Sequence, residues 1–177
     1  MGPGVTWAPI IRLGELARGP VSLDLAPDAA ARAAIAQDLD LVALPQFTAK
    51  ARVAPWHDGV VLSGRFAGVV TQVCGVSLEP FDQPIDGEFE VRLVPAGSPN
   101  LPGEDGGELT LDLDEADPPD LLDGDEIDVA AYVVEHLALA LDPFPRKPGV
   151  EFEFEDPDAA QASPFAALKT LQDRNRN

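Results

Sequence analysis

Hydrophobic and polar residues alternate along several stretches of the chain, which is the pattern of half-buried β-strands. In the clearest stretch, 47–53, the odd positions are apolar and the even positions are polar. A turn with the hairpin dipeptide Asp58-Gly59 follows, and a long strand is predicted over 60–74. Shorter strands are predicted at 21–25, 88–94 and, less clearly, 109–113. The stretch 150–154 alternates as well, and it fits either a charged edge strand or an acidic tail.

Two main helices are predicted, at 28–39 and at 128–141. Asp128 is suited to cap the second helix, and Pro143 ends it because the residue before a proline resists helical geometry. A third, short helix is predicted near the C-terminus, where Ser163-Pro164 precedes apolar residues at helical spacing.

The order of these elements favours an α+β fold rather than a regular β-α-β alternation. We expect a curved, mostly antiparallel sheet with two main helices, plus a short C-terminal helix on a flexible acidic linker. The curvature is inferred from Gly64 and Gly68, since glycine inside a strand often marks a bend or bulge. The predicted domains are an α+β domain over 1–155 and a linker with a helical tail over 156–177.

Charge is distributed unevenly along the chain, whose formal net charge is -19. Residues 82–158 contain 23 of the 31 acidic residues but 3 of the 12 basic ones. This block is either a solvated surface that maintains solubility or a surface that attracts a basic partner. It disfavours direct contact with bare RNA, because phosphate contacts require lysine and arginine.

The residues that carry chemistry form no catalytic or metal-binding constellation, so we expect neither an enzyme nor a cofactor. Cys74 is the one cysteine, which excludes an internal disulfide, and its strand-face position predicts a buried structural thiol. The acidic run 112–128 lacks the ligand spacing of a calcium loop. No apolar run approaches the length of a membrane helix, and 1–16 does not fit a signal peptide, so we expect a cytoplasmic protein.

Four stretches, in this order, resemble the YceD family. They are Cys74-Gly-Val-Ser-Leu-Glu-Pro-Phe81, Asp123-Gly-Asp-Glu-Ile-Asp128 leading into the helix with Glu135, Leu139-Ala-Leu-Asp-Pro-Phe-Pro-Arg146, and Pro164-Phe-Ala-Ala-Leu-Lys169. The resemblance implies a role in the synthesis, processing or stability of large-subunit (23S) ribosomal RNA. Some members of the family have a second cysteine where this chain has Ser77. A hydroxyl is a poor zinc ligand, so a zinc site is not expected here.

From the resemblance we expect a ribosome-biogenesis accessory factor that binds a ribosomal protein or a large-subunit assembly intermediate, with RNA involved indirectly. DNA and membranes are not expected as partners. The alternative is a direct RNA-binding module that uses Arg146, Lys147 and the basic C-terminal tail, although the first two residues could equally balance local charge. The C-terminal helix either docks on its own domain or anchors a partner. The predicted partner-binding residues are Glu79, Pro80, Phe81, Glu135, Arg146, Lys147, Phe165, Leu168 and Lys169.

Overall fold

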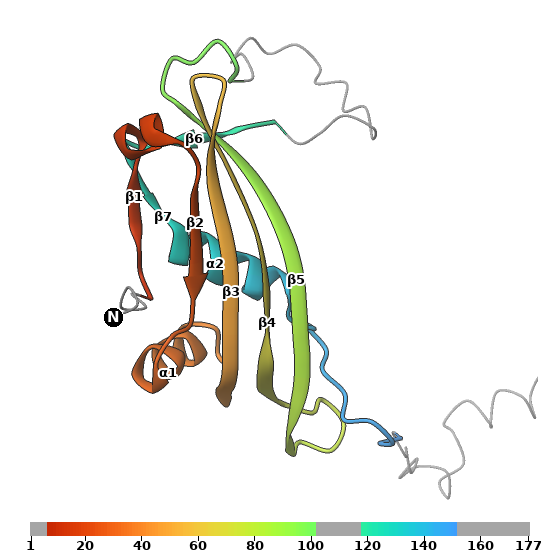
Figure 1. Ribbon diagram of the computed structural model, residues 1–177. Coiled ribbons are helices and arrows are strands. Elements are labelled where there is room, and N and C mark those ends of the chain that lie inside the picture. Colours follow the sequence, from red (N-terminus) through yellow and green to blue (C-terminus); the bar gives the residue numbers. More distant parts are fainter. Residues whose placement is uncertain (1–6, 102–117, 152–177) are drawn as a thin grey trace, which may run out of the picture.

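The computed structural model describes residues 7–101 and 118–151 (Figure 1). Its elements in chain order are β1 (Ile10–Arg12), the 3-10 helix η1 (Leu13–Arg18), β2 (Val21–Leu25), α1 (Ala29–Asp38), β3 (Ala43–Trp56), β4 (Gly59–Val73), β5 (Pro80–Pro95), β6 (Asp120–Leu122), β7 (Glu126–Asp128) and α2 (Val129–Ala140).

A five-stranded sheet with the order β2-β3-β4-β5-β6 forms the centre of the structure. Its pairs are antiparallel except β5 with β6, which is parallel. The short strands β1 and β7 pair with each other in a separate antiparallel ribbon. The three long central strands are therefore consecutive hairpin partners, and α2 crosses behind them in Figure 1.

The predicted alternation at 47–53 is confirmed and sets the two faces of the sheet. Phe47, Ala49, Ala51 and Val53 are buried, and the residues between them are exposed. Across the strand pairs, Leu62, Phe66 and Phe89 share the buried face. On α2, the spacing of Val129, Val133 and Leu137 places one helical stripe in the same core, and all three are 0% exposed. The opposite face of the sheet is polar and carries no helix of the described chain.

The predicted fold class, a curved sheet with two main helices, is wrong in its balance and in its curvature. Strands make up 46% of the described residues and helices 22%, and the sheet is not curled. The physical reason is strand length: β3, β4 and β5 have 14, 15 and 16 residues, where strands of about 5–6 are usual. Strands β3 and β5 continue well beyond the predicted ranges 47–53 and 88–94.

The glycines of β4 do not bend the strand as expected. The register with β3 and β5 runs without a break through Gly64 and Gly68, and the one irregularity on β3 lies between Ala43 and Gln46. Gly64 makes room for an aromatic ring instead, and so does Gly87 of β5. A Cβ on Gly64 would lie 2.7 Å from the Phe89 ring, and one on Gly87 would lie 2.6 Å from the Phe66 ring.

Strand β5 begins at Pro80, eight residues before the predicted strand 88–94, and includes Pro84. A proline inside a strand lacks the N–H that a ladder needs, so it is tolerated only at an edge. Among the described residues, β5 meets β6 only at Leu93–Pro95, so one side of β5 is an open edge around Pro84. The stretch around Pro84 can therefore form a strand although it contains proline, because the missing N–H lies at an open edge.

The two helices begin one residue after the start of their predicted ranges, and the predicted cap at Asp128 is confirmed. Asp28, predicted as the first residue of its helix, caps that helix as well. Asp28 accepts a hydrogen bond from Ala31 N at 2.8 Å, and Asp128 accepts one from Ala131 N at 3.0 Å. None of the helices within 7–101 and 118–151 has the length and hydrophobicity to cross a membrane. The predicted strand 109–113, most of 150–154, the linker from 156 and the C-terminal helix lie outside the described residues, as does the proposed domain boundary.

Candidate functional site

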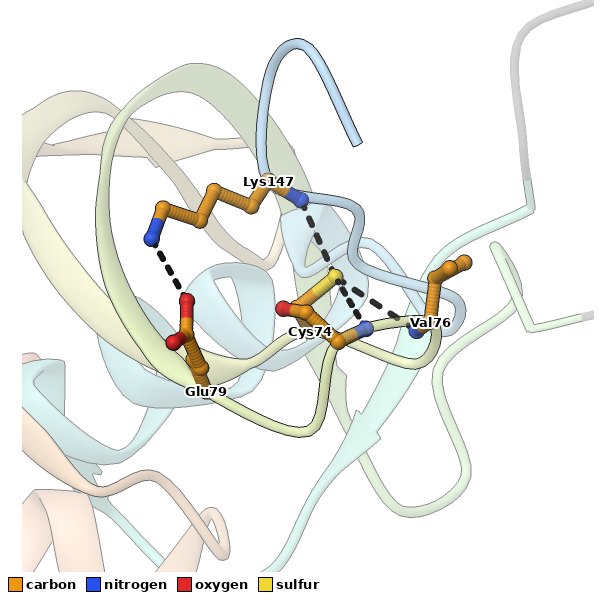
Figure 2. Close-up of polar contacts among 5 residues, drawn as sticks. Cys74, Val76, Glu79 and Lys147 are labelled. Carbon is orange, nitrogen blue, oxygen red and sulfur yellow. Dashed lines mark hydrogen bonds and ion pairs between the residues drawn. The ribbon is translucent and has the colours of Figure 1, made fainter. Parts of the chain in front are cut away.

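The first and third of the family-like stretches meet in space, although 68 residues separate Glu79 from Lys147. We call residues 74–79, which connect β4 to β5, the cysteine turn, and residues 142–147, which follow α2, the docking segment. Lys147 Nζ donates to Glu79 Oε2 at 2.8 Å (Figure 2). Gly75 N donates to the carbonyl of Pro145 at 2.9 Å, so backbone and side chains both join the two segments.

The cysteine turn is closed by its own backbone. Cys74 N donates to the carbonyl of Glu79, and Leu78 N donates to the carbonyl of Cys74, each at 2.9 Å. Closing the turn places Leu78 at a φ of 59°, in the left-handed region that bulky side chains rarely adopt. Since such conformations cost energy and cluster at functional positions, the turn is a candidate recognition element.

The sulfur of Cys74 lies at the centre of this junction. It accepts hydrogen bonds from the backbone N–H groups of Val76 and Ser77, both at 3.4 Å, and of Lys147 at 3.3 Å (Figure 2). Cys74 is 0% exposed, so the predicted burial is confirmed. Its surroundings are not the apolar strand face that the sequence suggested, because β4 ends at Val73 and the sulfur faces N–H donors.

These donors favour the thiolate. The Ser77 hydroxyl has the largest effect, and the N–H groups of Ser77, Lys147 and Val76 act in the same direction. Together they outweigh burial and lower the pKa of Cys74 from 9.0 to about 6. Ser77 Oγ is buried beside the sulfur, but its geometry falls outside that of a hydrogen bond, so the three N–H donors are the contacts that the structure supports directly.

The junction does not fit a zinc ion. Cys74 supplies one thiolate, its sulfur already accepts three N–H groups, and Ser77 supplies only a hydroxyl, whereas zinc usually requires four nitrogen or sulfur ligands. Within 7–101 and 118–151, no three His, Cys, Asp or Glu side chains gather closely enough to hold a metal ion.

The ion pair shifts the pKa of both of its members. The hydrogen bond and charge of Lys147 hold the pKa of Glu79 below its usual value, and Glu79 raises the pKa of Lys147. Both side chains remain accessible, with exposed fractions of 61% for Glu79 and 42% for Lys147. A partner can therefore compete for either charge.

Two large apolar side chains protrude from the same junction. Leu78 of the cysteine turn is 76% exposed, and Phe144 of the docking segment is 78% exposed. The closed turn directs the Leu78 side chain to solvent, whereas Phe81 is half-buried. Pro80 is exposed at the first position of β5. The sequence pattern gave no signal for the exposure of Leu78 or Phe144, which depends on how the two segments join.

The structure places the remaining predicted residues elsewhere. Arg146 is exposed on the docking segment beside Lys147. Glu135 is exposed on α2 and lines a separate groove of about 550 Å³ with Glu90, Tyr132 and His136, to which neither the turn nor the docking segment contributes. Phe165, Leu168 and Lys169 lie outside the described residues.

One of three comparisons with known proteins finds a match. A family model described as large ribosomal RNA subunit accumulation protein YceD matches residues 62–172, which is more than half of the chain. The matched region includes the cysteine turn, α2 and the docking segment. Comparison with curated proteins and with solved structures finds no match.

Proposed function

We propose, because the chain belongs to the YceD family of large ribosomal RNA subunit accumulation proteins, that it supports the accumulation of 23S ribosomal RNA as a non-enzymatic accessory factor. The family description supplies the role in large-subunit RNA. The mode of action is our proposal: the junction of the cysteine turn and the docking segment recognises a protein partner, and the acidic surface attracts it.

The observation that carries this proposal is that the two segments joined by the accessible ion pair of Glu79 and Lys147 each expose a large apolar side chain, Leu78 and Phe144. Apolar anchors next to charged groups are typical of protein interfaces, where the anchors give affinity and the charges give orientation. Catalysis is not supported at this junction. The low-pKa sulfur of Cys74 is fully buried, and its neighbours are backbone donors rather than a general base.

The partner that fits the charge is basic. Strand β5 presents a row of exposed acids on the outer face of the sheet, at alternating positions that point the same way: Asp82, Asp86, Glu88 and Glu90. With a net charge of -19 for the whole chain, such a row should accelerate association with a basic ribosomal protein and be weakened by salt.

The test combines a cellular and a biochemical measurement. In a strain depleted of this protein, we expect the ratio of large-subunit to small-subunit RNA to fall and to be restored by the wild-type gene. A pull-down from cells should recover ribosomal protein after nuclease treatment. An unchanged RNA ratio on depletion would contradict the role, and loss of all captured protein with nuclease would contradict a protein partner.

The charge of the partner is tested by neutralising Asp86 and Glu88 together, as Asp86→Asn and Glu88→Gln. Both are exposed, so the fold should tolerate the change. If the captured partner is basic, we expect slower association that resembles the effect of high salt. Association at the wild-type rate at low salt would mean that the row serves solubility alone.

A further inference from the structure

The outer face of the sheet has a second charge pattern, which depends on strand register. Antiparallel pairing aligns Asp24 of β2, Lys50 of β3, Arg65 of β4 and Glu88 of β5 in one row across four strands. The next row on the same face brings Arg52 opposite Ser63. Three cations therefore lie together on β3 and β4, with acids on the strands at either side.

Two of these cations face each other directly. Lys50 and Arg65 are partners in the register, and like charges at directly opposite positions destabilise a sheet. Arg52 lies diagonally from Arg65, at a distance of about 7–8 Å between backbones. An anion that bridges the cations would relieve the repulsion between Lys50 and Arg65.

The neighbouring acids neutralise this group only in part: Lys50 is paired with Asp24, and Glu88 lies opposite Arg65 in the register without forming an ion pair with it. Asp24 is engaged by Lys50 at 2.6 Å, in a pair whose side chains are 64% and 78% exposed and which a ligand can open at little cost. Glu90 is engaged by Arg92 at 2.9 Å. Within the described chain, Arg52 and Arg65 form no ion pair, and both are exposed.

The cations also share a concave surface. A shallow groove of about 770 Å³ lies over this part of the sheet, and its lining includes Lys50, Arg52 and Arg65 together with Ser22 and Ser63. The carboxylates of Asp24, Glu88 and Glu90 line the same groove, on the two outer strands. No helix or strand of the described chain covers it, since α2 packs on the opposite face (Figure 1). Hydroxyl and guanidinium donors around one hollow are the groups that phosphate oxygens accept from.

We propose that the outer face of β3 and β4 binds the phosphodiester backbone of RNA through Lys50, Arg52 and Arg65. The identity of the anion as RNA rests on the proposed function, whereas the anion site rests on register, exposure and charge alone. Arginine favours phosphate because its planar donors bind two oxygens at once. RNA then lies on the basic β3–β4 stripe and the basic protein partner on the acidic row of β5, and the two meet where Glu88 and Glu90 also line the groove.

The test is the salt dependence of binding to a short fluorescent single-stranded RNA, measured by anisotropy with the full-length protein. Each neutralised phosphate contributes about 0.7 to the slope of log affinity against log salt, so three cations predict a slope near -2. Affinity should then fall about 20-fold between about 50 and 200 mM salt. The double variant Arg52→Ala with Arg65→Ala should fall only about 3-fold over the same range, and it should bind more weakly at low salt.

A matched control removes two exposed arginines from another surface, Arg12→Ala with Arg18→Ala. We expect this control to keep the wild-type slope. An equal loss in both double variants would show a general charge effect and overturn the proposal, and a loss confined to the control would overturn it by placing the RNA contact on another surface. In the opposite direction, Glu88→Gln should strengthen RNA binding, because it removes repulsion beside Arg65.

A final pair of experiments tests the anion site separately from its role in RNA accumulation. If poly-glutamate competes as well as RNA at equal charge and depends on the same arginines, the site binds acidic peptide and the RNA proposal is wrong. If the Arg52/Arg65 variant loses RNA binding in solution but restores the large-subunit RNA ratio in depleted cells, the site stands and its link to the proposed function fails. If the variant loses RNA binding in solution and also fails to restore the RNA ratio in cells, the result supports both the anion site and its link to the proposed function.

Discussion

Replacing Leu78 with glycine should separate recognition from folding. Leu78 has a φ of 59° and is 76% exposed, so its backbone is strained while its side chain contributes little to the core. Glycine adopts this conformation without the Cβ clash, which relieves about 1–2 kcal/mol. Against this, glycine costs about 0.5–1 kcal/mol through greater freedom of the unfolded chain.

The lost burial is small. Full burial of a leucine side chain contributes about 1.5–3 kcal/mol, and about a quarter of Leu78 is buried, which gives about 0.5 kcal/mol. The three terms nearly cancel, so we expect the free energy of unfolding of Leu78→Gly to lie within about 1 kcal/mol of wild type. The same large side chain at Leu62, which is 0% exposed, would cost about 2–5 kcal/mol on truncation to alanine.

The assay pairs urea unfolding with restoration of the large-subunit RNA ratio in depleted cells. We expect Leu78→Gly to remain as stable as wild type and to lose function, since an exposed anchor is removed. The control is His57→Gly in the β3–β4 turn, where φ is 51° and the side chain is also exposed. This variant should keep both stability and function. A loss of more than about 2 kcal/mol in Leu78→Gly would mean that Leu78 packs into the fold and would refute the reasoning.

Three further predictions concern the junction and the helix caps. Glu79→Gln should leave the melting temperature nearly unchanged, because the pair with Lys147 is exposed, and should lose function in the RNA-ratio assay; full restoration would reduce Glu79 to a surface residue. Cys74 has a folded pKa of about 6 against an ordinary value of 9.0, so the stability it provides is present above pH 9 and is lost as pH falls through 6. Urea midpoints measured across this range should rise with pH in wild type and rise less in Cys74→Ala, and identical profiles would exclude a buried thiolate. Asp128→Ala and Asp28→Ala each remove a helix cap and should each cost about 1 kcal/mol in urea unfolding, yet only the first should also reduce function, because α2 leads into the docking segment; equal functional loss would point to stability alone.

The sequence by itself determined where most elements lie and which side of each is buried. Alternation at 47–53 is a local property of the chain, and so are the caps at Asp28 and Asp128, so both could be predicted without knowledge of distant residues. The resemblance to the YceD family likewise depends on short local stretches, and the family match confirms it. The error in fold class arose where local signals mislead: glycine and proline usually interrupt strands, but Gly64 lies under an aromatic ring and Pro84 lies at an open edge.

Only the tertiary structure decided what the chemistry-bearing residues do. Glu79 and Lys147 were both candidates, but that they bind each other depends on how the chain returns after α2. The polar surroundings of Cys74 come from the same return, because one of its three donors is Lys147 N. The cation group on the outer face depends on register: a shift of one residue between β3 and β4 would place Arg65 opposite a buried residue instead of Lys50. Register and chain return are set by the packing of the whole core, so residues distant in sequence acquire a common site only when the sheet and α2 are assembled.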